Sequence, residues 1–153
     1  MSSREGHSDP FNKFIYLLPA VEGGACTDAK QLLALHNTAR AAHGSKPLVW
    51  SATVARSATK WAERCIWSHS QSEYGENILM SWGTSTTCSI AMEYWYDNER
   101  DDYSYANPGY QPDAGHFSQV VWKATSQLGC GIAACDASTA PPSVRGPWTM
   151  MVW

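Results

Sequence analysis

Two histidines and two acids have the residue types from which a metal or acid–base site is built. They are His69 and Glu76 in HSQSEYGEN, Glu99 in YDNER and His116 in GHFSQVVW. Two neutral imidazoles supply nitrogen ligands for zinc or another borderline divalent cation. Carboxylates accept the remaining ring proton of such histidines or activate a metal-bound water. If the fold brings the four together, we expect a cleft in which His69 and His116 hold a cation.

Two observations limit this chemistry. Catalytic zinc usually takes three ligands from the protein, and the sequence contains no HExxH motif. A permanent catalytic zinc is therefore not expected, and Glu76 and Glu99 are catalytic candidates only if the chain is an enzyme. In the other interpretation, the four groups hydrogen-bond one another and hold the cleft in shape. The residues alone leave both interpretations open.

Four polar residues next to these positions, Ser70, Asn77, Ser118 and Gln119, are predicted to support the cleft by hydrogen bonding. Neither serine is expected to be a nucleophile, because no Asp-His-Ser order and no GxSxG elbow accompanies them. His36 and His43 lie seven residues apart in a predicted helix and are interpreted as packing residues.

The segment DYSYANPGY, residues 102–110, predicts a different chemistry. Tyr103, Tyr105 and Tyr110 alternate with small residues around the turn at Pro108, so their rings can be exposed to an apolar ligand. In the alternative interpretation, these tyrosines only cover the edge of the core.

Composition restricts the class of protein. The chain has 153 residues, of which 44% are hydrophobic, as expected for one domain with a single core. A net charge of -3, no basic run and no glycine-rich phosphate loop argue against nucleic acid or nucleotide partners. No apolar stretch approaches the roughly 18 residues that cross a bilayer.

The elements that must position these residues follow from periodicity. Helices are predicted over residues 28–43 with Thr27 as N-cap, from Ser51 to Cys65, over 78–82, and through Ile90 to Asp97. Apolar runs at 117–122, 129–135 and 148–153 are predicted to be strands. Together they predict an α+β single-domain α-β-α sandwich with a short antiparallel sheet between helices.

The motifs, in order, are ALHNTARAAHGSKPLVWS, ATKWAERCIWSHS, YGENI, AMEYWYDNERDDYSYANPGY, GHFSQVVWKATSQLGCGIAAC and WTMMVW. From about Ala29 to Trp153 they resemble the CAP superfamily, the cysteine-rich secretory, antigen 5 and pathogenesis-related 1 proteins, with a pattern most like fungal and plant members. That resemblance implies the same sandwich fold. It also implies a cavity that takes a divalent cation and is lined by His69, Glu76, Glu99 and His116.

The position of Glu99 departs from the family pattern. Family members usually place this Glu three residues after a Trp, whereas Trp95 precedes Glu99 by four. The spacing of 17 positions to His116 agrees with the family and favours Glu99 over Glu93, with Tyr96 in the place of the Trp. A helix that did not absorb the extra residue would rotate the carboxylate by roughly 100°.

The resemblance also implies a function. Fungal members bind and export sterols through an aromatic loop at residues 102–110, and other relatives hold fatty acids between helices. We therefore expect an extracellular, non-enzymatic carrier of sterols or fatty-acid-like ligands in export, defence or host interaction, for which no metal is required. The alternative is a divalent-metal-dependent protease or esterase in which Gln119 stabilises an oxyanion.

Five cysteines and no CxxC pair predict disulfides rather than a zinc or redox site. The resemblance pairs Cys65 with Cys135, whereas the family partner of Cys130 lies in the final strand, which here ends at Trp153 without the family's Cys and Pro-Pro-Gly-Asn segment. The domain, residues 27–153, is thus expected to be truncated or divergent there, with Cys26 or Cys88 as the alternative partner of Cys130. Residues 1–26 are expected to form an arm, whose segment FIYLLPAVEGGA resembles a secretory h-region preceded by a poor n-region.

Overall fold

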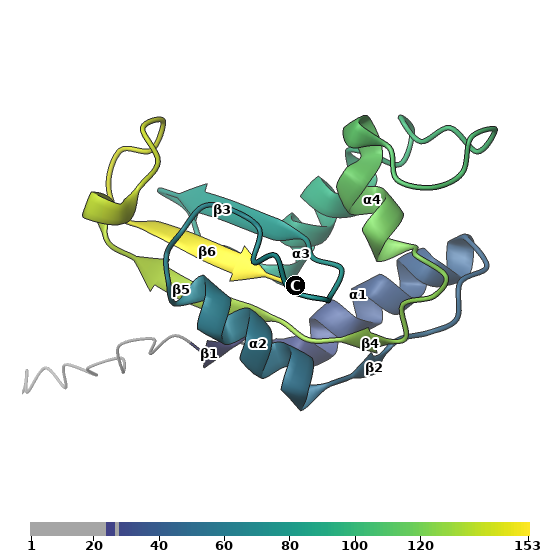
Figure 1. Ribbon diagram of the computed structural model, residues 1–153, viewed down its shortest axis with the longest axis horizontal. Helices are drawn as coiled ribbons and strands as arrows, with labels where there is room; N and C mark the ends of the chain where they lie inside the picture. Colours follow the sequence, from purple (N-terminus) through teal and green to yellow (C-terminus); the bar gives the residue numbers. More distant parts are fainter. Residues whose placement is uncertain (1–23, 27) are drawn as a thin grey trace, which may run out of the picture.

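The computed structural model describes residues 24–26 and 28–153. The predictions made for residues 1–23 and for the N-cap at Thr27 lie outside the described residues. The helices and strands follow one another along the chain (Figure 1) in this order: β1 (Gly24–Ala25), α1 (Ala29–Ala42), β2 (Val49–Trp50), α2 (Ala52–Ala62), β3 (Ile78–Trp82), α3 (Cys88–Met92), the π-helix η1 (Glu93–Asp97), the 3-10 helix η2 (Pro112–Ala114), α4 (Gly115–Val120), β4 (Gln127–Leu128), β5 (Gly131–Cys135), the 3-10 helix η3 (Ala137–Thr139) and β6 (Trp148–Val152).

Four antiparallel strands form the main sheet in the order β1-β5-β6-β3. The last strand of the chain, β6, lies inside the sheet and pairs with β3 in the register Ile78↔Val152 and with β5 in the register Gly131↔Val152. Strands β2 and β4 form a separate parallel pair. The sheet therefore fixes the start of β3, which begins two residues after Glu76.

Alternate residues of the sheet belong to two different cores. On one face, Met150 and Val152 pack with Ala58 and Ala62 of α2. On the other face, Leu79 and Met151 pack with Leu32 of α1 and with residues of α3, including Met92. Because side chains alternate along a strand, this division places the sheet between two layers of helices (Figure 1). The predicted α+β sandwich is confirmed.

Helix α2 lies unusually close to the strand beside it. A Cβ at Gly131 would meet the backbone of Thr59, and a Cβ at Gly129 would meet the backbone of Ala55. Glycine at both positions lets helix and strand backbones approach. Helix α2 begins as predicted, with the Ser51 side chain accepting from the Val54 N–H, while Asp28 caps α1 by accepting from the Gln31 N–H at 2.8 Å.

Two predicted elements were wrong. Residues 78–82 form strand β3 rather than a helix, and most of the run 117–122 lies in helix α4 rather than in a strand. Both are short apolar runs, for which periodicity does not separate helix from strand. Pairing with all five residues of β6 decides the first. The second continues a helical turn that begins at Pro112, a residue suited to the first turn of a helix.

Two disulfides join the N-terminal half of the chain to strand β5. Cys65 pairs with Cys135, with Cα atoms 5.6 Å apart, and Cys26 pairs with Cys130, with Cα atoms 5.5 Å apart. Cys88 is buried and free. The open question of the Cys130 partner is thus answered by Cys26.

Candidate functional site

The first His–Glu pair is formed within the loop between α2 and β3. The Nδ1 atom of His69 donates to Oε1 of Glu76 at 2.7 Å, and the Ser70 backbone N–H donates to the same oxygen at 3.0 Å. The imidazole is half exposed, whereas the Glu76 side chain is only 10% exposed. Glu76 therefore lies behind the imidazole and fixes its orientation.

The second pair joins α4 to the segment after η1. The Nδ1 atom of His116 donates to Oε1 of Glu99 at 2.5 Å, and the Phe117 N–H donates to Oε2 of Glu99 at 3.0 Å. Asn77 is buried and donates from Nδ2 to the His116 carbonyl at 3.1 Å. This hydrogen bond joins the residue just before strand β3 to the backbone of helix α4 at His116.

The π-helix η1 accounts for the unusual spacing of Glu99. Its wide turn is seen in the hydrogen bond from the Asn98 N–H to the Glu93 carbonyl, 2.9 Å long and five residues apart. A π-turn accommodates one residue more than an α-helical turn. Trp95 remains buried and donates from Nε1 to the Ile78 carbonyl, while Glu99 still reaches His116. Glu93, the rejected alternative, is exposed.

One cleft of about 510 Å³ is lined by His69, Glu99 and His116. Both Nδ1 atoms are engaged by carboxylates, and no described residue hydrogen-bonds either Nε2 atom. An ionised carboxylate only accepts, so each neutral imidazole carries its proton on Nδ1 and a lone pair on Nε2. The two histidines together offer the cleft two nitrogen ligands.

The donor set suits a weakly held cation rather than a structural zinc. Among residues 24–26 and 28–153, no group of three or more His, Cys, Asp or Glu side chains is arranged to hold a metal ion. Two imidazole nitrogens fit a borderline divalent ion that takes its remaining ligands from water or substrate.

The cleft also has an aromatic wall that no motif in the sequence predicted. Trp67 and Tyr94 line it and are 40% and 55% exposed. Both residues lie close in sequence to predicted site residues. Only the exposure of two large aromatic side chains, which the sequence does not show, would have marked them as part of the site.

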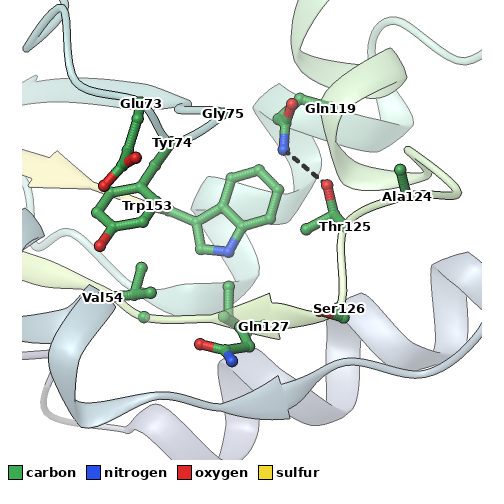
Figure 2. Close-up of a pocket in the computed structure, with 12 residues that line it drawn as sticks. Val54, Glu73, Tyr74, Gly75, Gln119, Ala124, Thr125, Ser126, Gln127 and Trp153 are labelled. Carbon is green, nitrogen blue, oxygen red and sulfur yellow. Dashed lines mark hydrogen bonds between the residues drawn. The ribbon is translucent and has the colours of Figure 1, made fainter.

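Two of the four polar residues predicted to support the cleft lie elsewhere. Ser118 donates from Oγ to the Gly115 carbonyl and lines the tyrosine pocket defined below. Gln119 lines a separate pocket of about 410 Å³ beside the indole of Trp153. Figure 2 shows its amide directed at Thr125, whose Oγ1 accepts from Nε2 at 3.4 Å. Gln119 is therefore not among the residues that line the His/Glu cleft.

The tyrosine loop covers a third pocket, of about 580 Å³, which we call the tyrosine pocket. Tyr103, Tyr105, Pro108 and Gly109 line one side. The other side is formed by residues of the α1 end and of the segment after α4: His43, Ser45, Ser118, Val121, Trp122, Lys123 and Ala124. Tyr110 is 72% exposed and does not line the pocket.

His43 ties the loop to the helices. Its Nδ1 atom is 3.0 Å from the Tyr105 hydroxyl and its Nε2 atom is 2.9 Å from the Tyr96 hydroxyl. Partial burial lowers the pKa of His43, and the nearby Arg100 charge lowers it further. The neutral ring therefore bridges two phenols, one as donor and one as acceptor.

Comparison with known proteins agrees with this architecture. The CAP model, described as the cysteine-rich secretory protein family, matches residues 33–151. The chain belongs to this family, as its sequence motifs predicted. The match begins within α1 and ends within β6, and of the helices and strands only β1 lies wholly outside it.

Relatives include proteins of fungi and plants. Protein PRY2 of Saccharomyces cerevisiae is 44% identical over 65% of this chain and 30% of its own length. Fruiting body protein SC7 of Schizophyllum commune is 36% identical over 80% of this chain and 59% of its own. Pathogenesis-related protein 1 of Arabidopsis thaliana is 30% identical over 82% of this chain and 83% of its own. The chain thus spans less than two thirds of the two fungal relatives.

Solved structures share the fold. A structure of NaASP2 with Zn2+ has a TM-score of 0.66 and 22% identity, covering 84% of this chain and 80% of that one. MpPR-1i has a TM-score of 0.57 and 19% identity, covering 80% of this chain and 82% of that one. Within the described part of this chain, no helix has the length and apolar character needed to cross a membrane.

Proposed function

We propose that this chain is a secreted carrier of a sterol or a similarly sized apolar ligand, bound in the tyrosine pocket. The observation that carries the proposal is the tyrosine loop itself, which lines one side of a cavity of about 580 Å³. Small-molecule sites commonly enclose about 300–1,000 Å³ and are lined by apolar and aromatic groups with a few polar ones.

The exposed rings supply the driving force. Tyr105 and Trp122 are 64% and 43% exposed at the pocket. Apolar area removed from water stabilises a complex by about 25 cal/mol per Å² before the costs of association are subtracted. The hydroxyls of Tyr105 and Ser45 lie among these apolar groups, hydrogen-bonded to His43 and to the Val121 carbonyl respectively, and the Ser45 oxygen keeps acceptor capacity for a ligand hydroxyl. A largely apolar molecule with one polar end matches this lining.

The proposal assigns no direct role to a metal. The tyrosine pocket and the His/Glu cleft share none of their lining residues. Ligand binding is therefore expected to be unaffected by chelators. The two disulfides are typical of proteins that fold in an oxidising compartment, which supports secretion.

A binding assay with radiolabelled cholesterol and ergosterol tests the proposal. Tyr105→Ala removes a pocket ring, and Tyr110→Ala, which removes an exposed ring outside the lining, is its matched control. We expect Tyr105→Ala to lower affinity about tenfold or more, which corresponds to about 1.4 kcal/mol, and Tyr110→Ala to leave it unchanged. His69→Ala combined with His116→Ala should bind sterol normally with or without EDTA. Loss of binding only in the histidine variant would contradict the proposal.

The paired imidazoles favour one alternative, a metal-dependent hydrolase in the cleft. A cation on the two Nε2 atoms would supply Lewis-acid chemistry there. Glu99 has both oxygens hydrogen-bonded by His116 and Phe117. Glu76 keeps an oxygen free to take a proton, but it lies behind His69 and is not among the residues that line the cleft. NaASP2, which has the same fold, was crystallised with Zn2+. Zinc-dependent peptidase or esterase activity that disappears in Glu76→Gln would favour this alternative over carriage alone.

A further inference from the structure

The aromatic wall of the His/Glu cleft lies outside the tyrosine pocket to which we assign the sterol. Trp67 comes from the loop after α2 and Tyr94 from the π-helix η1, and both rings are substantially exposed at the same cleft. Residues of β3, including Ile78 and Met80, line the same cleft. The cleft therefore presents an apolar surface edged by two large rings, a feature that marks ligand sites when it is exposed.

The cleft's polar groups are also built for a ligand. The Nδ1 proton of each imidazole is committed to a carboxylate, at 2.7 Å for Glu76 and at 2.5 Å for Glu99. Each ring therefore keeps one orientation, and its Nε2 atom remains a hydrogen-bond acceptor with no partner among the described residues. Because His69 and His116 come from different segments, these two acceptors stand at separate points of the cleft.

Charge narrows the class of ligand. No Lys or Arg lines the cleft, and each imidazole is backed by a carboxylate. An anionic ligand would meet negative potential without a compensating cation. A wholly apolar ligand would cover the two Nε2 acceptors and leave them without donors, which costs about 1–3 kcal/mol for each buried polar group.

We propose that the cleft binds a neutral saccharide. A pyranose ring has an apolar C–H face, which stacks on the aromatic rings of Trp67 or Tyr94, and a periphery of hydroxyl donors, which reach the Nε2 atoms of His69 and His116. One molecule of this kind therefore contacts both the aromatic rings and the two hydrogen-bond acceptors of the cleft. The volume of about 510 Å³ lies within the usual range for small-ligand sites.

The site is distinct from the tyrosine pocket. Two residues of helix α4 line different sites: His116 lines the cleft, whereas Ser118 lines the tyrosine pocket. Saccharide binding and sterol binding can therefore be lost independently, and failure of one proposal leaves the other standing.

Isothermal titration with three uncharged hexasaccharides, a β-1,4-glucan, a β-1,3-glucan and an N-acetylated chitin fragment, tests the inference on the whole chain. We expect saturable binding of at least one. Trp67→Ala should weaken it about tenfold or more and Trp67→Phe should restore part of it. Trp82→Ala is the matched control, because Trp82 is 47% exposed and lies outside the cleft lining. Its affinity should equal that of the wild type.

A second variant tests the hydrogen bonds that the ligand is proposed to make with the two imidazoles. His69→Leu combined with His116→Leu should lose binding while keeping the wild-type thermal unfolding midpoint to within a few degrees. If a variant unfolds, saturation-transfer NMR on the wild-type chain takes its place, with contacts expected at the Trp67 and Tyr94 rings. The inference is overturned if none of the three hexasaccharides binds at millimolar concentration, or if Trp67→Ala and Trp82→Ala bind equally well.

Discussion

At the scale of single residues, the described histidines differ in the surroundings of their side chains. His69 and His116 face the cleft, His43 bridges two tyrosines, and His36 is fully buried against Trp153 with ring centroids 4.4 Å apart. The sequence motifs singled out the first two. They assigned His36 and His43 to packing, which holds for His36, but gave no sign that His43 contacts the tyrosine loop, because that contact joins residues 62 positions apart.

His36 makes stability depend on pH. Burial, the largest cause, and the nearby Arg40 charge lower its pKa from 6.5 to about 4, against the raising effect of its hydrogen bond with the Leu32 carbonyl. The unfolded chain therefore binds the extra proton first as pH falls. Its contribution to stability is complete above pH 6.5 and is lost progressively toward pH 4, by about 3 kcal/mol at most.

Urea unfolding of wild type and His36→Phe between pH 4 and 7.5 measures this effect. The wild type should lose stability on acidification and the variant should lose clearly less. His7→Phe changes a histidine that the sequence places in the N-terminal arm and serves as the control. Parallel pH profiles for wild type and His36→Phe would contradict the assignment.

Arg40 is the second residue whose role depends on burial. Its guanidinium donates to the carbonyls of Lys46, Val120, Trp122 and Thr125 at 2.8–2.9 Å. Removing it leaves four carbonyls without this donor, one of them in a buried hydrogen bond and three in part-buried ones, and a buried acceptor left unsatisfied costs about 1–3 kcal/mol. We expect Arg40→Ala to lower the free energy of unfolding by at least about 3 kcal/mol in urea titrations. Arg56→Ala, which changes an exposed arginine, should change it by less than about 1 kcal/mol.

At the scale of elements, the π-helix reconciles core packing with site geometry. An uninterrupted α-helix through residues 88–99 would place either Trp95 or Glu99 wrongly, by roughly 100° about the helix axis. The spacing to His116 was enough to favour Glu99 from the sequence. The way in which the extra residue is absorbed was not predictable, because it depends on Trp95 finding its place in the core.

Inserting one alanine after Tyr94 tests this role of the π-helix. The insertion lengthens η1 by one residue beyond what a π-turn accommodates, whereas Tyr94→Ala keeps the length. We expect the insertion to break the His116–Glu99 hydrogen bond, and Tyr94→Ala to preserve it. Long-range ¹H–¹⁵N spectra of the His116 ring report the bond through its tautomer. An unchanged Nδ1–H tautomer in the insertion variant would show that η1 does not position Glu99.

Other elements show the limits of local pattern. Helices α1 and α2 have long amphipathic runs and were predicted from them, and Ser51 caps α2 as predicted. Strand β3 and helix α4 are short, and their types are decided by partners distant in sequence, β6 for the former and Glu99 with Asn77 for the latter.

At the scale of the whole molecule, two disulfides close the chain over sequence separations of 104 and 70 residues and both end on or beside β5. Removing such a bridge from a small domain typically costs about 2–5 kcal/mol. Cys26→Ser with Cys130→Ser should therefore lower the urea midpoint markedly. Cys88→Ala removes a buried thiol without a disulfide and should have a smaller effect. Equal midpoints for the two variants would contradict a stabilising role for the first bridge.

In the whole molecule, the His/Glu cleft and the tyrosine pocket are separate candidate sites, lined by His116 and Ser118 of helix α4 respectively. NMR chemical-shift mapping with ergosterol in the absence of metal tests that separation, and the carrier function with it, most directly. Perturbations are predicted at Tyr103, Tyr105, Val121 and Trp122, with the His69 and His116 ring signals unchanged. Perturbations centred on the two histidine rings, with the tyrosine loop unaffected, would contradict the account.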